Sequence, residues 1–322
     1  MKIKNRVVVV TGASSGIGRA TALAFAGRGA VVVLAARNAR ALEQAAAECG
    51  KRGAVALAVP TDVTDADAVE ELARRAVERF GRIDVWVNCA AVTLFGPFAE
   101  VPLEDFRRVL DVNVMGYVHG ARSALPRLRE QGEGVLVNVS SVAGVVPQPY
   151  THAYGMSKHA VRALGTSLRQ ELRLEGARKV KVCTVMPAAV DTPIFQHAAN
   201  YSGRRALAMP PVYSAERVAH TIVGLVRSPR GEIVVGPMGR NLIRQFKLAP
   251  RLTERVVATQ VDRGHLSRKE AQAATSGNLY RPVPGPGSVA GGWHGRRRTA
   301  VRRTLTVAAL AGVGAAAWLA TR

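Results

Sequence analysis

Three kinds of side chain that can cooperate in proton transfer lie within one stretch of this 322-residue chain. Residues 136–158 include the hydroxyls of Ser140 and Ser141, the phenol of Tyr154 and the ammonium of Lys158. Tyr154 and Lys158 are four residues apart, so on a helix they share one face, with Cβ atoms roughly 5–6 Å apart. The combination suits general acid–base chemistry at a carbonyl or an alcohol.

Tyr154 is predicted to be the group that transfers the proton. A phenol has an ordinary pKa of about 10, which is too high for ready proton exchange near neutral pH. An ammonium fixed beside it favours the phenolate, so we expect Lys158 to lower the pKa of Tyr154. A serine hydroxyl would hold the substrate oxygen and share its developing charge. The alternative is a chance pair, with the phenol packed and the ammonium in water.

The elements around this stretch indicate how it is positioned. The run 136–139 is apolar and β-branched, which predicts a buried strand with the serines at its carboxyl end. Ligands of open α/β sheets bind at that edge. A helical pattern that carries the tyrosine and the lysine starts near residue 151.

The amino terminus predicts a phosphate-binding turn. The apolar run 6–10 is followed at once by TGASSGIGRA, a helical pattern and a second strand at 30–35. Gly12, Gly16 and Gly18 would let backbone N–H groups and the positive end of the helix approach a pyrophosphate. This strand–turn–helix–strand order indicates a dinucleotide-binding unit.

These motifs together resemble those of the classical short-chain dehydrogenase/reductase family, over roughly residues 3–240. The family's T-G-x-x-x-G-x-G pattern matches residues 11–18, and its Y-x-x-x-K pattern matches Tyr154 and Lys158. The resemblance implies that Ser141 rather than Ser140 is catalytic, and that Asn113 supports a water that relays protons to the lysine. Stabilisation of the helix 103–120 is the other role open to Asn113.

The resemblance also implies a fold and an assembly. The fold is a Rossmann-type doubly wound parallel α/β sheet of about seven strands with helices on both faces. Relatives are oligomeric, so a homo-oligomer, either a dimer or a tetramer, is expected.

Most of the residues that would bind the dinucleotide follow from the same resemblance. They are Gly12, Ser14, Ser15, Gly16, Ile17, Gly18, Arg37, Asp62, Val63, Asn88, Ala90, Tyr154, Lys158, Pro187, Val190 and Thr192. Asp62 would accept from the adenine amino group, although a helix cap by Asp62 or Asp65 is the alternative. Thr192 would bond the nicotinamide carboxamide or cap the next helix. The chain departs from the family pattern at Cys89, Ala91 and Ala188.

The end of the second strand favours NADP(H) over NAD(H). NAD-preferring relatives carry an acidic residue there, whereas this chain reads LAARN with Arg37. An arginine pairs bidentately with a 2′-phosphate, which an acid would repel. The alternative is that Arg37 is a solvated turn residue.

Residues 193–213 are expected to form the substrate lid, because such loops vary and carry specificity. An apolar substrate is indicated by Phe195, Tyr201, Leu207 and Met209. We place Arg204 and Arg205 at the rim of the lid and expect His197 to be solvated. No metal-ligand cluster is evident in the sequence.

The net charge of +22 is concentrated beyond residue 200, where 20 basic residues face 5 acidic ones. We divide the chain into a catalytic domain (1–240), a helical extension (241–276), a Pro/Gly-rich and basic linker (277–303) and a possible membrane-anchor helix (304–322). The extension could lie on a membrane, on a partner subunit or on the core. Nucleic acid binding is disfavoured, since no recognised module accompanies the charge.

The anchor prediction rests on sixteen uncharged residues, 305–320, behind a basic cluster. An interfacial or oligomer-packing helix and a disordered tail are the alternatives. The three cysteines are scattered and no signal peptide is evident, so we expect a cytoplasmic catalytic domain in a reducing compartment.

The sequence therefore predicts an NADP(H)-dependent oxidoreductase that interconverts a carbonyl and a secondary alcohol, with an apolar small-molecule substrate. One alternative is a nucleotide-binding redox sensor without turnover, whose sign would be degenerate catalytic residues. Another is an epimerase or dehydratase of the extended branch, whose T-G-x-x-G-x-x-G spacing residues 11–18 do not fit.

Overall fold

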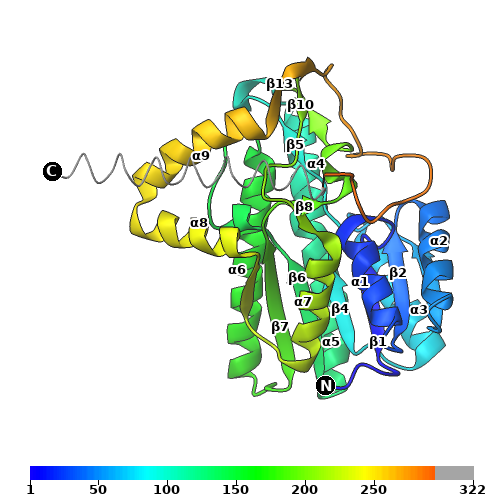
Figure 1. Cartoon of the computed structure of the whole chain (residues 1–322). Helices are drawn as coiled ribbons and strands as arrows, with labels where there is room; N and C mark the ends of the chain where they lie inside the picture. The colour runs from blue at the N-terminus through cyan, green and yellow to red at the C-terminus, as the bar shows by residue number, and fades with distance from the viewer. Residues whose placement is uncertain (294–322) are drawn as a thin grey trace.

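A seven-stranded sheet with helices on both faces forms the centre of the computed structural model, which describes residues 1–293 (Figure 1). The strand order is β12-β7-β6-β4-β1-β2-β3, and every neighbouring pair is parallel. This arrangement confirms the predicted Rossmann-type doubly wound sheet. The strands are β1 (Val7–Thr11), β2 (Val31–Ala36), β3 (Ala56–Pro60), β4 (Val85–Asn88), β6 (Gly134–Val139), β7 (Val180–Pro187) and β12 (Glu232–Val235).

Longer helices connect these strands and short strands frame the site. The helices are α1 (Gly16–Ala26), α2 (Ala39–Gly50), α3 (Ala66–Phe80), α4 (Leu103–Leu110), α5 (Gly116–Glu130), α6 (His152–Leu174), α7 (Ala215–Arg227), α8 (Pro237–Leu248) and α9 (Pro250–Gly264). The short strands are β5 (Leu94–Phe95), β8 (Val190–Asp191), β9 (Ala199–Asn200), β10 (Arg204–Ala206), β11 (Tyr213–Ser214) and β13 (Leu266–Ala271). Single 3-10 turns lie at Phe98–Glu100, Val142–Gly144 and Pro193–Phe195.

The valine run of β1 is explained by burial on both faces of the sheet. Val8 and Val10 belong to the core that includes side chains of α1, α2 and α7. Val7 and Val9 belong to the core that includes side chains of α3, α5 and α6. Successive residues of a strand point to opposite faces, so a central parallel strand covered by helices on both sides is apolar throughout.

The helix predicted at 103–120 is present, and it contains a π-helical turn that the prediction did not include. Helix α4 ends at Leu110, a π-helical turn occupies Asp111–Met115, and α5 then starts at Gly116. The wider turn carries Asn113, whose amide bonds the backbone of Val92 on a neighbouring segment. Such π turns inside helices are frequent at functional sites.

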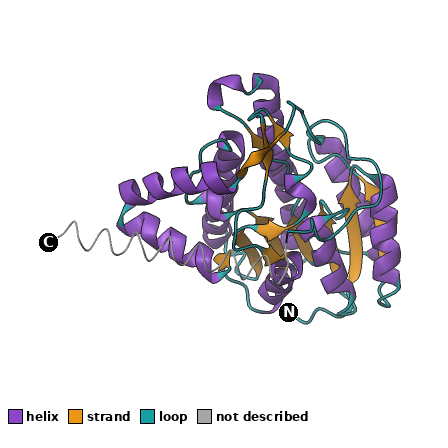
Figure 2. Cartoon of the chain, turned by 45° about the horizontal axis from the view of Figure 1, so that its top comes forward, coloured by secondary structure: helices purple, strands orange, loops and turns teal. Residues whose placement is uncertain are grey.

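The extension after the sheet packs on the catalytic domain. Leu242, Ile243 and Phe246 of α8 lie in an apolar cluster with Val257 and Val261 of α9. Strand β13 then pairs with β10. Figures 1 and 2 show the two helices as an arm beside the sheet. Of the three alternatives for the extension, packing on the core is therefore the one that holds for Leu242, Ile243 and Phe246.

Residues 277–293 run back along the carboxyl edge of the sheet and over α1 and β2, as the orange trace in Figure 1 shows. Leu279 is completely buried in the core. These residues are the described part of the predicted linker, and their backbone bonds the catalytic domain at several places.

No helix within residues 1–293 has both the length and the apolar character needed to cross a bilayer. The membrane anchor predicted at 304–322 and the basic residues before it lie outside the described residues, so the anchor stays a prediction.

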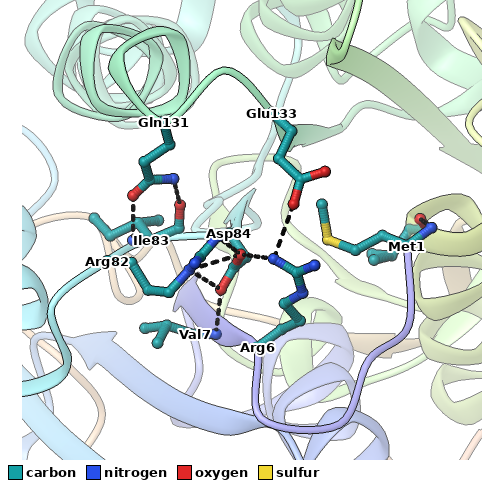
Figure 3. A network of polar contacts seen from close by, with 9 residues as sticks. Met1, Arg6, Val7, Arg82, Ile83, Asp84, Gln131 and Glu133 are labelled. Carbon is teal, nitrogen blue, oxygen red and sulfur yellow. Dashed lines mark hydrogen bonds and ion pairs between the residues drawn. The ribbon is translucent and has the colours of Figure 1, made fainter.

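The opposite, amino-terminal edge of the sheet is held by the buried carboxylate of Asp84 (Figure 3). It accepts from the guanidinium of Arg6 at 2.6 Å, from Arg82 at 2.7 Å and from the backbone N–H of Val7 at 2.9 Å. The side-chain amide of Gln131 accepts from the N–H of the adjacent Ile83 and donates to its carbonyl oxygen. The network ties the start of β1 to the start of β4.

We expect Asp84→Asn to lower the free energy of unfolding by about 2–4 kcal/mol, because two guanidinium groups lose their buried anion. Urea denaturation would measure this loss. The matched control is Glu133→Gln, since Glu133 pairs with the same Arg6 but is 40% exposed, and its loss should cost less than about 1 kcal/mol. Equal stabilities of the two variants would contradict the role given to Asp84.

Candidate active site

A cavity of about 370 Å³ opens at the carboxyl edge of the sheet. Ser141, Tyr154 and Lys158 line it together with the glycine turn between β1 and α1. Strand β6 ends at Val139 and presents the serine, while the first two turns of α6 present the tyrosine and the lysine. The structure thus brings the predicted proton-transfer group and the predicted phosphate-binding turn to one cavity.

The two serines after β6 have different partners. Ser140 is buried and donates its hydroxyl to the backbone oxygen of Lys158 at 2.8 Å, which ties β6 to α6. The hydroxyl of Ser141 accepts from the N–H of Ala143 at 3.1 Å and bonds Tyr154. Ser141 is therefore the serine placed to act with the phenol.

The ammonium of Lys158 is almost completely buried. It donates to the backbone oxygen of Val139 at 3.0 Å and to the phenol of Tyr117 at 3.4 Å. It lies 5.0 Å from the ring centre of Tyr117 and 5.5 Å from that of Tyr154. Burial lowers the pKa of Lys158 to about 8, against a smaller opposing effect of Cys89.

The pKa of Tyr154 is raised, not lowered, which corrects the prediction. Burial is the largest cause, the hydrogen bond with Ser141 acts against it, and the thiol of Cys89 adds to the rise. The prediction considered the nearby ammonium and left out the low polarity of the surroundings, which disfavours the phenolate. In this structure the phenol is therefore protonated at neutral pH.

Asn113 acts on the backbone. Its Oδ1 accepts from the N–H of Val92 at 2.9 Å, and its Nδ2 donates to the oxygen of Val92 at 2.9 Å and to the hydroxyl of Ser157 at 3.1 Å. The amide is fully buried and does not line the cavity. These bonds fix the chain after β4 against α6, and the water relay stays a prediction.

The glycine turn is packed so closely that it has no room for side chains at Gly12 and Gly18. Gly12 has a φ of +68°, and a Cβ there would lie 2.8 Å from Cα of Ala90. A Cβ on Gly18 would lie 2.2 Å from the oxygen of Gly12. Helix α1 has no acidic residue in its first turn, so its positive end faces the cavity without a competing carboxylate.

Most of the residues predicted to bind cofactor line this cavity. They are Gly12, Ser14, Ser15, Gly16, Ile17, Gly18, Arg37, Asp62, Val63, Ala90, Tyr154, Lys158, Pro187, Val190 and Thr192. Asn88 does not, because its side chain bonds Trp86, Asn138 and the backbone of Tyr117 inside the core. Thr192 makes no side-chain cap to the following turn.

Arg37 is held by backbone oxygens at the far end of the cavity. Its two terminal nitrogens donate to Leu279 at 2.9 Å and to Asn278 at 2.6 Å. Burial, the largest effect, lowers its pKa. Arg37 is therefore not a solvated turn residue, and no sequence pattern pointed to these partners.

Asp62 has partners of its own within the chain. Its carboxylate accepts from the N–H and hydroxyl of Thr64 and from Arg108 at 3.0 Å. Burial raises its pKa, but the bonds from Thr64 and the charge of Arg108 outweigh this, so the pKa lies below its ordinary value. The helix cap of α3 belongs to Asp65, which accepts from Asp67 and Ala68.

The lid, residues 193–213, only partly agrees with the prediction. Phe195 and Met209 line the cavity, whereas Tyr201 and Leu207 do not. Arg204 is not a rim residue, because it pairs with Asp262 at 2.7 Å and bonds backbone oxygens of 262, 266 and 267. Arg205 pairs with Glu270.

The histidine predicted to be solvated is half-buried. His197 lines the cavity, and burial lowers its pKa.

Sequence reasoning missed His265, which is buried and lines the cavity. The centre of its ring lies 5.8 Å from the ring centres of Phe95 and Phe195. Nδ1 is 2.8 Å from the oxygen of Leu207, and because a carbonyl only accepts, Nδ1 carries the proton. Burial lowers the pKa, which leaves Nε2 as an acceptor. The residue follows a helix with no motif around it, so nothing in the sequence marks it.

Known proteins are similar to this chain over most of its length. The family model described as short chain dehydrogenase matches residues 6–202. An uncharacterized oxidoreductase of Bacillus subtilis, YxnA, is 37% identical over 258 residues, 80% of this chain and 72% of its own. The 1-deoxy-11-beta-hydroxypentalenate dehydrogenase of Streptomyces exfoliatus is 43% identical over 199 residues, 61% of this chain and 71% of its own.

Solved structures agree with the sequence relatives. A short-chain dehydrogenase/reductase from Burkholderia phymatum in complex with NAD is 29% identical and superposes with a TM-score of 0.71, covering 79% of this chain and 97% of its own. An alcohol dehydrogenase from the archaeon Thermococcus sibiricus complexed with 5-hydroxy-NADP is 28% identical with a TM-score of 0.62, covering 72% and 96%.

The sheet, the glycine turn and the buried tyrosine–lysine pair define an enzyme that binds a nicotinamide dinucleotide at the carboxyl edge of its strands. With the family match over residues 6–202, the chain belongs to the short-chain dehydrogenase/reductase family. It is an NAD(P)-dependent oxidoreductase of the kind that acts on CH–OH and C=O groups.

Removing the buried ammonium should stabilise the fold while it impairs function. Lys158 is charged in both the folded and unfolded states below a pH of about 8, so its burial cost is full at pH 7. Above the ordinary pKa of 10.5 it is neutral in both states and the cost disappears. We expect Lys158→Met to raise the free energy of unfolding by on the order of 1–3 kcal/mol at pH 7, with the gain shrinking as the pH rises from 8 to 10.

Chemical denaturation of wild type and variant at pH 7 and at pH 10 measures this difference. The control is Lys181→Met on β7, where the lysine is exposed and the change should stay within about 0.5 kcal/mol. A variant that is less stable than wild type at pH 7, or a gain that does not vary with pH, would contradict the burial argument.

Proposed function

We propose that the enzyme interconverts a carbonyl and a secondary alcohol with NADP(H), and that Tyr154 transfers the proton. The observation that carries this proposal is the grouping of Ser141, Tyr154 and Lys158 at the cavity of the glycine turn, with the ammonium 5.5 Å from the centre of the phenol ring. A bound nicotinamide supplies the hydride in reduction and accepts it in oxidation.

Each member of the site has one task in the proposed reduction. The hydroxyl of Ser141 holds the substrate carbonyl oxygen, and Tyr154 donates its proton to that oxygen as negative charge develops on it. Lys158 stabilises the phenolate that remains and binds the ribose. In oxidation the proton moves the other way, from the alcohol to the phenolate.

The residues that would hold the dinucleotide are those of the glycine turn and the strand ends. Backbone N–H groups of 14–18 would bind the pyrophosphate, Asp62 and Val63 would lie at the adenine, and Thr192 would meet the carboxamide. Arg37 supports NADP(H), because no carboxylate follows β2 and a guanidinium can pair with a 2′-phosphate. The sheet, the turn and these side chains fit the group.

We propose an apolar substrate. Val142, Phe95, Phe195, Met209 and Leu242 line the cavity. The Nε2 of His265 in this wall would accept a hydrogen bond from a substrate hydroxyl. One relative is named for a hydroxypentalenate, which agrees with a substrate that carries a hydroxyl on a carbon framework.

Tyr154→Phe should reduce kcat by at least about 10³-fold while the Kd of NADPH changes less than about threefold, since only the proton donor is lost. Turnover is followed by NADPH absorbance with a panel of apolar ketones and secondary alcohols. Tyr213→Phe is the control, because this phenol bonds Met238 and does not line the cavity. A Tyr154→Phe enzyme that keeps its activity would overturn the proposed mechanism.

We also propose a homo-oligomer. Helices α4 and α6 pack together and leave Leu103 71% exposed and Met156 56% exposed, with Phe98 beside them in the preceding turn 68% exposed. Large apolar side chains gathered on one surface favour an interface. Light scattering should find a dimer or tetramer for the wild type and a monomer for Leu103→Glu with Met156→Glu. A monomeric wild type would contradict the proposal.

A further inference from the structure

A segment from the end of the described chain covers the cofactor cleft along its length. We call residues 277–293 the strap. At its start, the oxygens of Asn278 and Leu279 accept from Arg37, and Leu279 also accepts from Arg108 at 3.1 Å. At its end, the N–H groups of Gly291 and Trp293 donate to Asp191.

Between these ends the strap lies on the phosphate-binding turn. The oxygen of Ser288 accepts from the N–H of Gly16 at 2.8 Å, at the first residue of α1. The oxygen of Gly287 accepts from Arg19 at 2.5 Å. Asn38 donates to the oxygens of Val283 and Gly285. Residues 282–287 line the same cavity as the glycine turn, so the strap forms the outer wall of the cleft.

The strap places acceptors on the groups that would recognise phosphate. A guanidinium and the N–H groups at the start of a helix are both donors that bind anions. Arg37 is the strongest case, because both of its terminal nitrogens are bonded by strap oxygens. Its charge and its two parallel donors favour a 2′-phosphate over a 2′-hydroxyl.

One part of the strap is anchored and the other is held weakly. Leu279 is completely buried, and the phenol of Tyr280 donates to Asp105 at 2.8 Å. Residues 281–284, 286 and 288 are exposed, and their contacts are mostly backbone hydrogen bonds. Segments with little buried apolar surface open at low cost. The strap can therefore move away from the glycine turn, but the bonds to Arg37 are released only when the side chain of Leu279 also leaves the core.

We propose that the strap is part of the cofactor site and sets the preference between NADPH and NADH, because its carbonyl oxygens and a 2′-phosphate share Arg37. A 2′-phosphate must draw the guanidinium away from Asn278 and Leu279, whereas a 2′-hydroxyl leaves these bonds intact. The closed strap therefore reduces the advantage that Arg37 alone would give to NADPH. This inference rests on the proposed dinucleotide site.

Leu279→Ala combined with Gly287→Ala should release the strap at both places where it is held. The first change removes the buried side chain that fixes the oxygens bonded to Arg37. At the second, a Cβ would lie 1.9 Å from the backbone oxygen of Ser14, so the two segments must separate. The control in the same segment is Ser288→Ala, because Ser288 bonds Gly16 through its backbone oxygen and not through its hydroxyl.

The experiment uses the full chain and measures the Kd of NADPH and of NADH by calorimetry, together with hydrogen exchange of peptides from 278–293. In this double variant we expect faster exchange throughout the strap and a rise of about 5- to 10-fold in the ratio Kd(NADH)/Kd(NADPH). Ser288→Ala should match wild type in both readouts. In an Arg37→Met background, the same two changes should leave the ratio unchanged, because the shared group is gone.

Each other result counts against the strap. Faster exchange with an unchanged ratio would show that the strap and the 2′-phosphate do not share Arg37. Unchanged exchange in the double variant would show that the strap is not closed as proposed. A wild type that binds neither cofactor would instead overturn the proposed function, so the two failures are distinguishable.

Discussion

The site depends on the buried ammonium of Lys158. Its partners are the carbonyl of Val139 and the phenol and rings of Tyr117 and Tyr154, and none of these carries the negative charge that a carboxylate would supply. Lys158 is held there because its surroundings are fixed from several directions: Ser140 bonds its backbone, Tyr117 bonds Val139, and Asn113 bonds the neighbouring Ser157. A buried cation is costly, and the cost is met by the packing of β6, α5 and α6. The same burial keeps the phenol of Tyr154 protonated, which is the state that the proposed reduction requires.

The two edges of the sheet have different roles. At the amino edge, Asp84 joins β1 to β4 through charged hydrogen bonds that touch no part of the cavity. At the carboxyl edge, polar groups such as Ser141 and the N–H groups of the glycine turn face the cavity. The stabilising contacts of Asp84 and the cavity thus lie at opposite ends of the strands. The sheet can therefore carry the destabilising charge of Lys158 at one edge while charged hydrogen bonds stabilise the other edge.

Local patterns in the sequence predicted the strand, glycine turn and helix at the amino terminus, and they brought both serines, Tyr154 and Lys158 together, because spacing along a strand or a helix is displayed directly. The seven-stranded sheet and the choice of Ser141 followed from the family resemblance. The direction of the pKa shift of Tyr154 was not predictable in this way, because it depends on how much polar surface remains after folding. The π-helical turn at Asn113 likewise depends on a partner, Val92, on another segment.

The partners of Arg37 were hidden for a different reason. Backbone oxygens bind it, and every residue has one, so a proline- and glycine-rich segment that caps a guanidinium leaves no side-chain signal. Leu279 proves to be completely buried, but in the sequence it is one of several apolar residues of this segment and nothing distinguishes it. Contacts of this kind are visible only in three dimensions.

Because the strap is tethered to the domain that it covers, its local concentration at the glycine turn is fixed by the chain itself and does not fall on dilution. Closure is therefore equally favourable in a dilute assay and in a crowded compartment. The fraction of enzyme molecules whose strap is closed over a cleft without a dinucleotide would depend on the concentration of the dinucleotide and not on that of the enzyme.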